Sequence, residues 1–116
     1  MRKNLNYSIR NYGAYEDNWD GYKGIPAKEE TIKDAINFLK FLPRDAALPF
    51  SGLSGDGEIN LFWDRGGIYI DIGFIGDKKF SYYTRDEKGK EIFGDNILIL
   101  TTLPSSLINL IKTIIL

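Results

Sequence analysis

The chain has 116 residues, of which 43% are hydrophobic and 27% charged, the composition of a single globular domain that buries its own core. It contains no cysteine and no histidine, which excludes disulfide scaffolds and cysteine-based zinc sites and removes the commonest general base and metal ligand. The formal net charge of −1, from 15 basic and 16 acidic residues, gives no overall attraction for nucleic acids or anionic membranes.

Residues 1–25 are predicted to form an ordered but irregular arm. They are rich in Asn, Tyr, Gly and Asp and show the periodicity of neither a helix nor a strand. The arm carries more aromatic rings than a free tail would, because exposed rings gain free energy when they are buried. These rings belong to Tyr7, Tyr12, Tyr15, Trp19 and Tyr22.

The densest motif of the arm is the run Trp19-Asp20-Gly21-Tyr22. Asp-Gly favours a turn, because the Asp side chain accepts hydrogen bonds from nearby backbone N–H groups and Gly adopts a positive φ. One interpretation is an anchor that clamps the arm onto the core. The other is a recognition loop, since Trp and Tyr dominate binding hot spots.

A helix is predicted over residues 26–42. Apolar residues recur there at helical spacing, and Glu29 and Glu30 fall in the first turn, where the helix dipole favours acids. Pro43 ends the helix. Residues 43–57 contain Pro and Gly at short intervals and are predicted to be a loop.

Residues 58–100 are predicted to form an antiparallel meander of three to four strands. Apolar and polar residues alternate over 59–63, 68–74 and 80–84, with glycine-containing turns between these segments. A fourth strand is expected within residues 90–100. This pattern gives the sheet one apolar face and one face of mixed polar and aromatic residues.

A second helix is predicted over residues 103–115, opened by Leu103-Pro104. It is apolar around most of its circumference, so we expect it to be buried against the sheet or to form a homodimer interface. The predicted fold class is α+β, a single domain covering residues 1–116. In it, two helices pack on one face of the antiparallel sheet and an irregular arm precedes them.

Three segments of the sequence together resemble a group of small bacterial proteins. They are N-W-D-G-Y-K-G-I-P at 18–26, the helix end F-L-K-F-L-P at 38–43 and the strand D-G-E-I-N-L-F-W at 56–63. That group has a W-D-G-Y-G…P opening, a helix closing in L-P and a D-G-E-I-x-L-x-W strand. The resemblance covers roughly residues 18–85 and implies the same architecture and a bacterial or mobile-element origin, but no activity. Lys23 stands where the group often has Gly, which implies a shift in the geometry of this loop.

The alternation places aromatic and polar side chains together on the outer face of the sheet. Such a face suits a protein interface, can stack nucleic-acid bases, or simply pairs its rings across strands in solvent. The acids Glu58, Asp64 and Asp71 oppose a phosphate backbone and disfavour nucleic acid. The residues of this face that we expect to contact a partner are Phe62, Tyr69, Asp71, Tyr83 and Arg85.

Carboxylates are the remaining route to catalysis or metal binding in a chain without His and Cys. The candidate acids fall at turns or at exposed strand positions, and the spacing of a calcium-binding loop is absent. We interpret them as solvated acids. The sequence therefore predicts no catalytic residue, no metal site and no cofactor.

The leading hypothesis is a small non-enzymatic factor that binds another protein and inhibits it, of the antitoxin, immunity or phage anti-defence type. Its contact residues would be the outer-face set together with Trp19, Asp20 and Tyr22 of the arm. The alternative is a small-ligand or nucleic-acid binder that uses the outer sheet face. A third hypothesis is a carboxylate-based, metal-dependent hydrolase that uses Asp20 or Asp71.

We expect the protein to be cytoplasmic and not membrane-bound. The N-terminus lacks the apolar segment of a secretory signal. The longest apolar stretch, Leu103–Leu116, is interrupted by polar residues and is shorter than the about 20 residues that span a bilayer.

Overall fold

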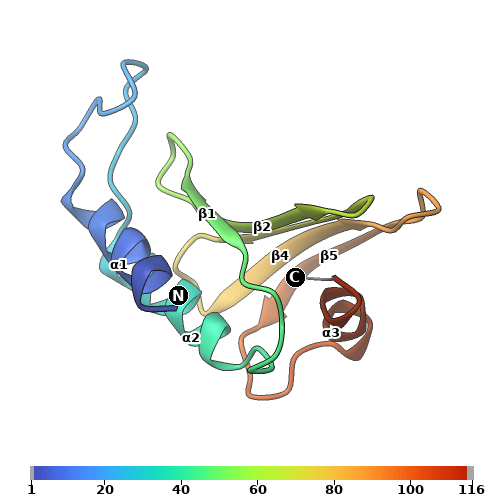
Figure 1. Cartoon of the computed structure of the whole chain (residues 1–116). Helices are drawn as coiled ribbons and strands as arrows, with labels where there is room; N and C mark the ends of the chain where they lie inside the picture. Colours follow the sequence, from blue (N-terminus) through green and yellow to red (C-terminus); the bar gives the residue numbers. More distant parts are fainter. Residues whose placement is uncertain (1, 115–116) are drawn as a thin grey trace.

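A five-stranded antiparallel sheet organises the computed structural model, which describes residues 2–114 (Figure 1). Strands that follow one another in the chain are neighbours in the sheet, so the topology is a meander. The predicted α+β class and antiparallel meander are confirmed, with one more strand than the three to four expected. The strands are β1 (Phe50–Leu53), β2 (Ile59–Arg65), β3 (Ile68–Phe74), β4 (Lys79–Arg85) and β5 (Glu91–Leu98).

β1 lies within residues 43–57, so the prediction that this whole segment is a loop was wrong. Phe50 pairs with Phe62 and Leu53 pairs with Ile59 in register with β2. The strand has only four residues, and Pro and Gly surround it. The residues of β1 alone do not favour a strand. The strand forms because they pair with β2.

The N-terminal residues also differ from the prediction, because α1 (Arg2–Asn11) and a 3-10 turn η1 (Tyr12–Ala14) replace the start of the irregular arm. The helix has a narrow apolar stripe, of which Ile9 is fully buried and Leu5 partly buried. Most helical stability comes from packing such a stripe, which is why the local sequence did not predict it. α1 packs beside α2 and against β1.

α2 (Glu29–Lys40) and α3 (Ser105–Lys112) lie inside the segments predicted to be helical, and both are shorter than expected. Lys28 is still extended, with φ −72° and ψ 157°, so residues 26–28 lead into α2 and do not belong to it. Leu103 is buried but precedes α3. Ile115, the predicted end of the second helix, lies outside the described residues.

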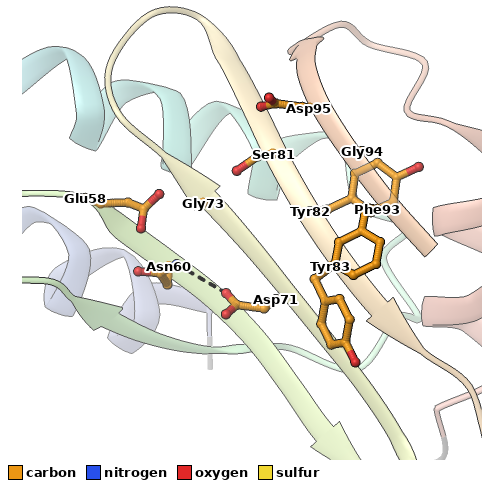
Figure 2. A pocket seen from close by; sticks show the side chains of 10 residues that line it. All are labelled: Glu58, Asn60, Asp71, Gly73, Ser81, Tyr82, Tyr83, Phe93, Gly94 and Asp95. Atoms are coloured by element: carbon orange, nitrogen blue, oxygen red, sulfur yellow. Dashed lines mark hydrogen bonds between the residues drawn. The ribbon is translucent and has the colours of Figure 1, made fainter. Parts of the chain in front are cut away.

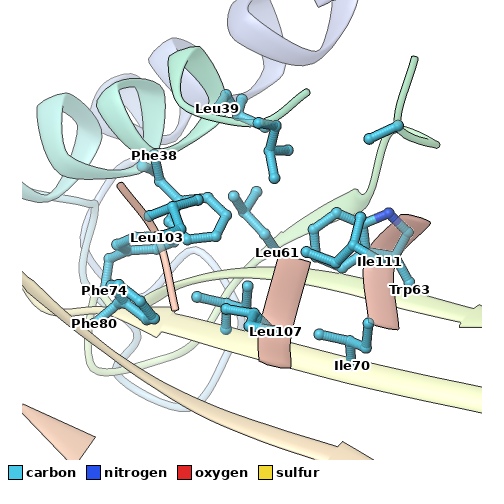
Figure 3. Packing of buried hydrophobic residues seen from close by; sticks show 14 of the residues in the cluster. Phe38, Leu39, Leu61, Trp63, Ile70, Phe74, Phe80, Leu103, Leu107 and Ile111 are labelled. Atoms are coloured by element: carbon cyan, nitrogen blue, oxygen red, sulfur yellow. The ribbon is translucent and has the colours of Figure 1, made fainter. Parts of the chain in front are cut away.

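Both α2 and α3 pack on the same face of the sheet, as predicted, and enclose the core there (Figure 3). Phe38 of α2 lies edge-on to Phe74 and Phe80, with ring centroids 5.5 and 5.2 Å away. Trp63 is buried, and its Nε1 donates a hydrogen bond to the Ala47 carbonyl at 2.8 Å. Among residues 2–114, no helix has the length and apolarity to cross a membrane. The helices thus occupy one face of the sheet, and the opposite face is where a site must be sought.

Candidate functional site

The outer face of the sheet, opposite α2 and α3, is not covered by any other element of residues 2–114 (Figure 1). Its side chains alternate along β2 and along most of β3 with those of the core. Phe93 on β5 and Phe50 on β1 are 72% and 67% exposed, although phenylalanine is among the residues most often buried. The sheet therefore presents large apolar groups to solvent at both of its edges.

An aromatic row crosses the outer face from β3 to β5. The ring centroids of Tyr69 and Tyr83 are 6.0 Å apart, and those of Tyr83 and Phe93 are 5.0 Å apart. The guanidinium carbon of Arg85 lies 5.9 Å from the centroid of the Tyr69 ring, which is within the range of a cation–π contact. Phe62 pairs instead with Phe50, at a centroid distance of 5.7 Å. The outer face therefore carries two clusters of rings, one at each side of the sheet.

A trough of about 530 Å³ lies beside the aromatic row on the same face (Figure 2). Small residues on neighbouring strands leave the trough hollow, because Gly73 pairs with Ser81 across β3 and β4. A Cβ atom on Gly73 would lie 2.6 Å from Oε2 of Glu58, so glycine makes room for the Glu58 carboxylate. On β5, a Cβ atom on Gly94 would overlap the ring of Tyr82. The trough is lined by Glu58, Asn60, Asp71, Gly73, Ser81, Tyr82, Tyr83, Phe93, Gly94 and Asp95.

Carboxylates give the trough its charge. Asp71 accepts hydrogen bonds from Nδ2 of Asn60 at 3.2 Å and from the Tyr69 hydroxyl at 3.4 Å. Burial raises the pKa of Glu58, the neighbouring charges of Asp56 and Asp71 raise it further, and a hydrogen bond with Asn60 partly opposes this. The neighbouring negative charges therefore lie close enough to Glu58 to disfavour its ionisation.

The phenols of the aromatic row hold their protons tightly. Burial and the adjacent Asp71 raise the pKa of Tyr69, and a hydrogen bond to Glu91 raises the pKa of Tyr83. In that bond the Tyr83 hydroxyl donates to Oε2 of Glu91 at 2.7 Å. Within the described residues, no group of three or more acidic side chains is placed to hold a metal ion. The carboxylates and rings of this surface can attract and stack a cation.

A second hollow of about 310 Å³ continues the outer face toward β1. It shares Asn60 and Asp71 with the trough and is lined on its other side by Phe62 and Tyr69. The hollow surface of the outer face thus extends across all of the strands.

Hydrogen bonds hold the Trp19–Tyr22 loop together, and Ile25, which follows the loop, joins it to the β1–β2 hairpin. Nε1 of Trp19 donates to the Ile25 carbonyl at 2.7 Å, and the Ile25 N–H donates to the Gly55 carbonyl at 2.9 Å. Oδ1 of Asp20 accepts from the backbone N–H groups of residues 22 and 24, and these bonds lower the pKa of Asp20. Trp19 and Asp20 thus hold the loop together, and Tyr22, 88% exposed, projects from it.

Lys23 adopts a φ of +63°. This is the left-handed region that glycine enters without steric strain. The backbone at Lys23 therefore has a conformation that favours glycine.

The structure places the residues predicted from the sequence on two surfaces. Phe62, Tyr69, Asp71, Tyr83 and Arg85 lie together on the outer face, whereas Trp19, Asp20 and Tyr22 belong to the separate loop beside the β1–β2 hairpin.

Sequence reasoning left Phe50, Phe93 and Asp95 out of the site and did not place Glu58 among its contact residues. Phe93 and Asp95 belong to β5, whose register was not known, and Phe50 belongs to the unpredicted β1. The alternation that runs through β5 up to its bulge could have identified Phe93.

Comparison of the chain with protein-family models, with curated proteins and with solved structures gives no match.

Proposed function

We propose that this protein is a small, non-enzymatic binding factor that docks on another protein through its outer sheet face and thereby inhibits it. The observation that carries the proposal is the uncovered aromatic row beside a hollow of about 530 Å³. Exposed apolar groups rimmed by polar ones mark interaction surfaces, and aromatic residues and Arg are enriched in protein interfaces.

The chemistry of the face supports binding over catalysis. Its ionisable groups include carboxylates, phenols and the guanidinium of Arg85, and both phenols of the row have a raised pKa. Of the two acids that a hydrolase would use, Asp20 caps a loop and Asp71 is held by Asn60 and Tyr69. An inhibitor of the antitoxin, immunity or phage anti-defence type needs only such a surface.

Affinity capture tests the proposal with a matched control. Phe93 and Tyr7 are both 72% exposed, but Tyr7 lies on α1, away from the outer face. We expect the tagged protein and its Tyr7→Ala variant to recover the same stoichiometric protein partner from the native host. The Phe93→Ala and Tyr83→Ala variants should lose it, and the purified protein should reduce the activity of that partner.

Two results would contradict this function. One is the absence of any stoichiometric partner in repeated captures. The other is a partner that the outer-face variants recover as well as the unaltered protein does. If the partner is bound but keeps its full activity, the inhibitory role is contradicted and only the binding role is supported.

A second candidate function is the binding of a small organic cation. The trough volume of about 530 Å³ falls within the range of small-molecule sites. Titration calorimetry with small guanidinium and ammonium compounds would detect such a ligand. The nucleic-acid alternative predicts oligonucleotide binding at low salt, which the carboxylates of the face oppose.

A further inference from the structure

We infer that the trough on the outer face receives an extended basic segment of the partner, with an arginine side chain lying between Glu58, Asp71 and Asp95 and against the rings of Tyr83 and Phe93. This inference rests on the proposed function and adds the chemistry of the partner to it. Three features carry it: the charge of the trough, its aromatic wall and its shape.

The charge of the trough selects a cation. Glu58 precedes β2, Asp71 lies on β3 and Asp95 lies on β5, so the fold brings the carboxylates together from separate parts of the chain. Among the residues that the structure describes, the one ion pair joins Lys33 and Glu29 on α2, so none of these three acids is engaged in an ion pair. Burial and like charge raise the pKa of Glu58, and a bound cation would relieve both effects.

The aromatic wall favours arginine among cations. The Tyr83 and Phe93 rings stand 5.0 Å apart along one side of the trough (Figure 2). A guanidinium is planar, stacks on aromatic faces and donates to carboxylates in a fork. The same face already holds one guanidinium in this way, because Arg85 lies over the ring of Tyr69.

The shape of the trough favours a segment of chain over a metal ion. Gly73 and Ser81 give it a low floor across neighbouring strands, and the hollow toward β1 continues from Asn60 and Asp71. The carboxylates do not form a cluster suited to a metal in the described part of the chain. An extended peptide, in contrast, can follow the hollow and place its side chains in it.

Fluorescence anisotropy with labelled peptides tests the inference on the whole protein. The peptides have equal length and alternate glycine and serine with arginine, lysine, glutamine or glutamate. We expect the arginine peptide to bind most tightly and the lysine peptide more weakly. We also expect binding to weaken as salt is added, because these charges are partly exposed. The glutamine and glutamate peptides should not bind.

Charge-removing variants locate the peptide. Glu58→Gln and Asp71→Asn keep the shape of each side chain and should each raise the Kd of the arginine peptide by about tenfold. Both variants remove repulsion between acids, so we expect them to fold. Glu30→Gln makes the same change of net charge on α2, on the other face of the sheet, and should leave the Kd unchanged.

The inference is overturned if the arginine peptide binds no better than the glutamine peptide, or if Glu30→Gln weakens binding as much as Glu58→Gln does. Its failure is distinguishable from failure of the proposed function. If the Phe93→Ala variant loses a protein partner that the Glu58→Gln and Asp71→Asn variants still bind, the proposed function is supported. The inference that the partner inserts a basic segment is then contradicted.

Discussion

The carboxylate of Asp20 lies directly against Gly24: a Cβ atom on Gly24 would stand 2.6 Å from Oδ1 of Asp20, the oxygen that accepts the Gly24 N–H at 2.7 Å. The same carboxylate also approaches Gly55 of the β1–β2 hairpin, where a Cβ atom would be 3.1 Å from Oδ2. The loop at 18–26 and the connection between β1 and β2 therefore meet at one side chain. The turn exists because one acid and two glycines fit together.

Replacement of Gly24 by alanine should break this arrangement. The added methyl group would displace the Asp20 carboxylate and leave backbone N–H groups without their acceptor, at a cost of about 1–2 kcal/mol in the free energy of unfolding. Urea denaturation measures this change. Gly52→Ala is the matched control, because nothing lies within 4 Å of a Cβ there, and it should cost clearly less.

Replacement of Lys23 by glycine should stabilise the protein. Lys23 holds a φ of +63°, which is strained for a residue with a side chain. Relief of this strain should raise the free energy of unfolding by about 0.5–1 kcal/mol, after the greater chain entropy of glycine is subtracted. Lys28→Gly, at a φ of −72°, should give no such gain. Equal gains at both positions would show that backbone strain is not the cause.

Removal of the Arg2 side chain should loosen α1. Its guanidinium donates to the carbonyl of Leu39 at 2.8 Å and to that of Pro43 at 3.2 Å, and so joins α1 to the end of α2. Arg2→Ala should lower the free energy of unfolding by about 1–3 kcal/mol, because these are hydrogen bonds from a charged donor. Hydrogen exchange should become faster in α1 before the sheet is affected. Lys3→Ala, at an exposed position on the same helix, is the control.

Glu58 should make stability depend on pH. The pKa of Glu58 is raised in the folded protein from its ordinary value of 4.5. At a pH between these two pKa values, the folded state therefore holds a proton that the unfolded chain has released. Stability from this group is present below the unfolded pKa and is lost as the pH rises through the folded pKa. Glu58→Gln should therefore be more stable than the unaltered protein at neutral pH, and the difference should shrink toward pH 4.5. Thermal unfolding across this range measures it, and a difference that does not change with pH would refute the account.

The sequence was sufficient for the parts of the fold that have a strong local pattern. β2, β3 and β4 alternate between core and outer residues over most of their length, and α2 has both a full apolar face and a proline after it. α1 and β1 could not be predicted, because each depends on packing against distant residues such as Leu39 and Phe62. Their own residues carry too few apolar groups in too short a stretch.

The sequence allowed us to predict which residues lie on the outer face, but not the shape of that face. Alternation put Tyr69, Tyr83 and Arg85 on one surface. The trough, in contrast, depends on the pairing of Gly73 with Ser81 and on the position of Asp95 at the bulge in β5, and no local rule gives either. The register between strands decides which side chains surround a hollow, and register is a property of the assembled sheet.

The meander separates the residues that hold the fold together from those that a partner would touch, because neighbours along each of the strands β2 and β3 point to opposite faces. A change at Tyr69 or Asp71 leaves the packing of Ile70 and Ile72 in place. The outer face can therefore diverge rapidly while the scaffold persists, which would let one architecture follow a changing target or be redirected by mutagenesis to a new one.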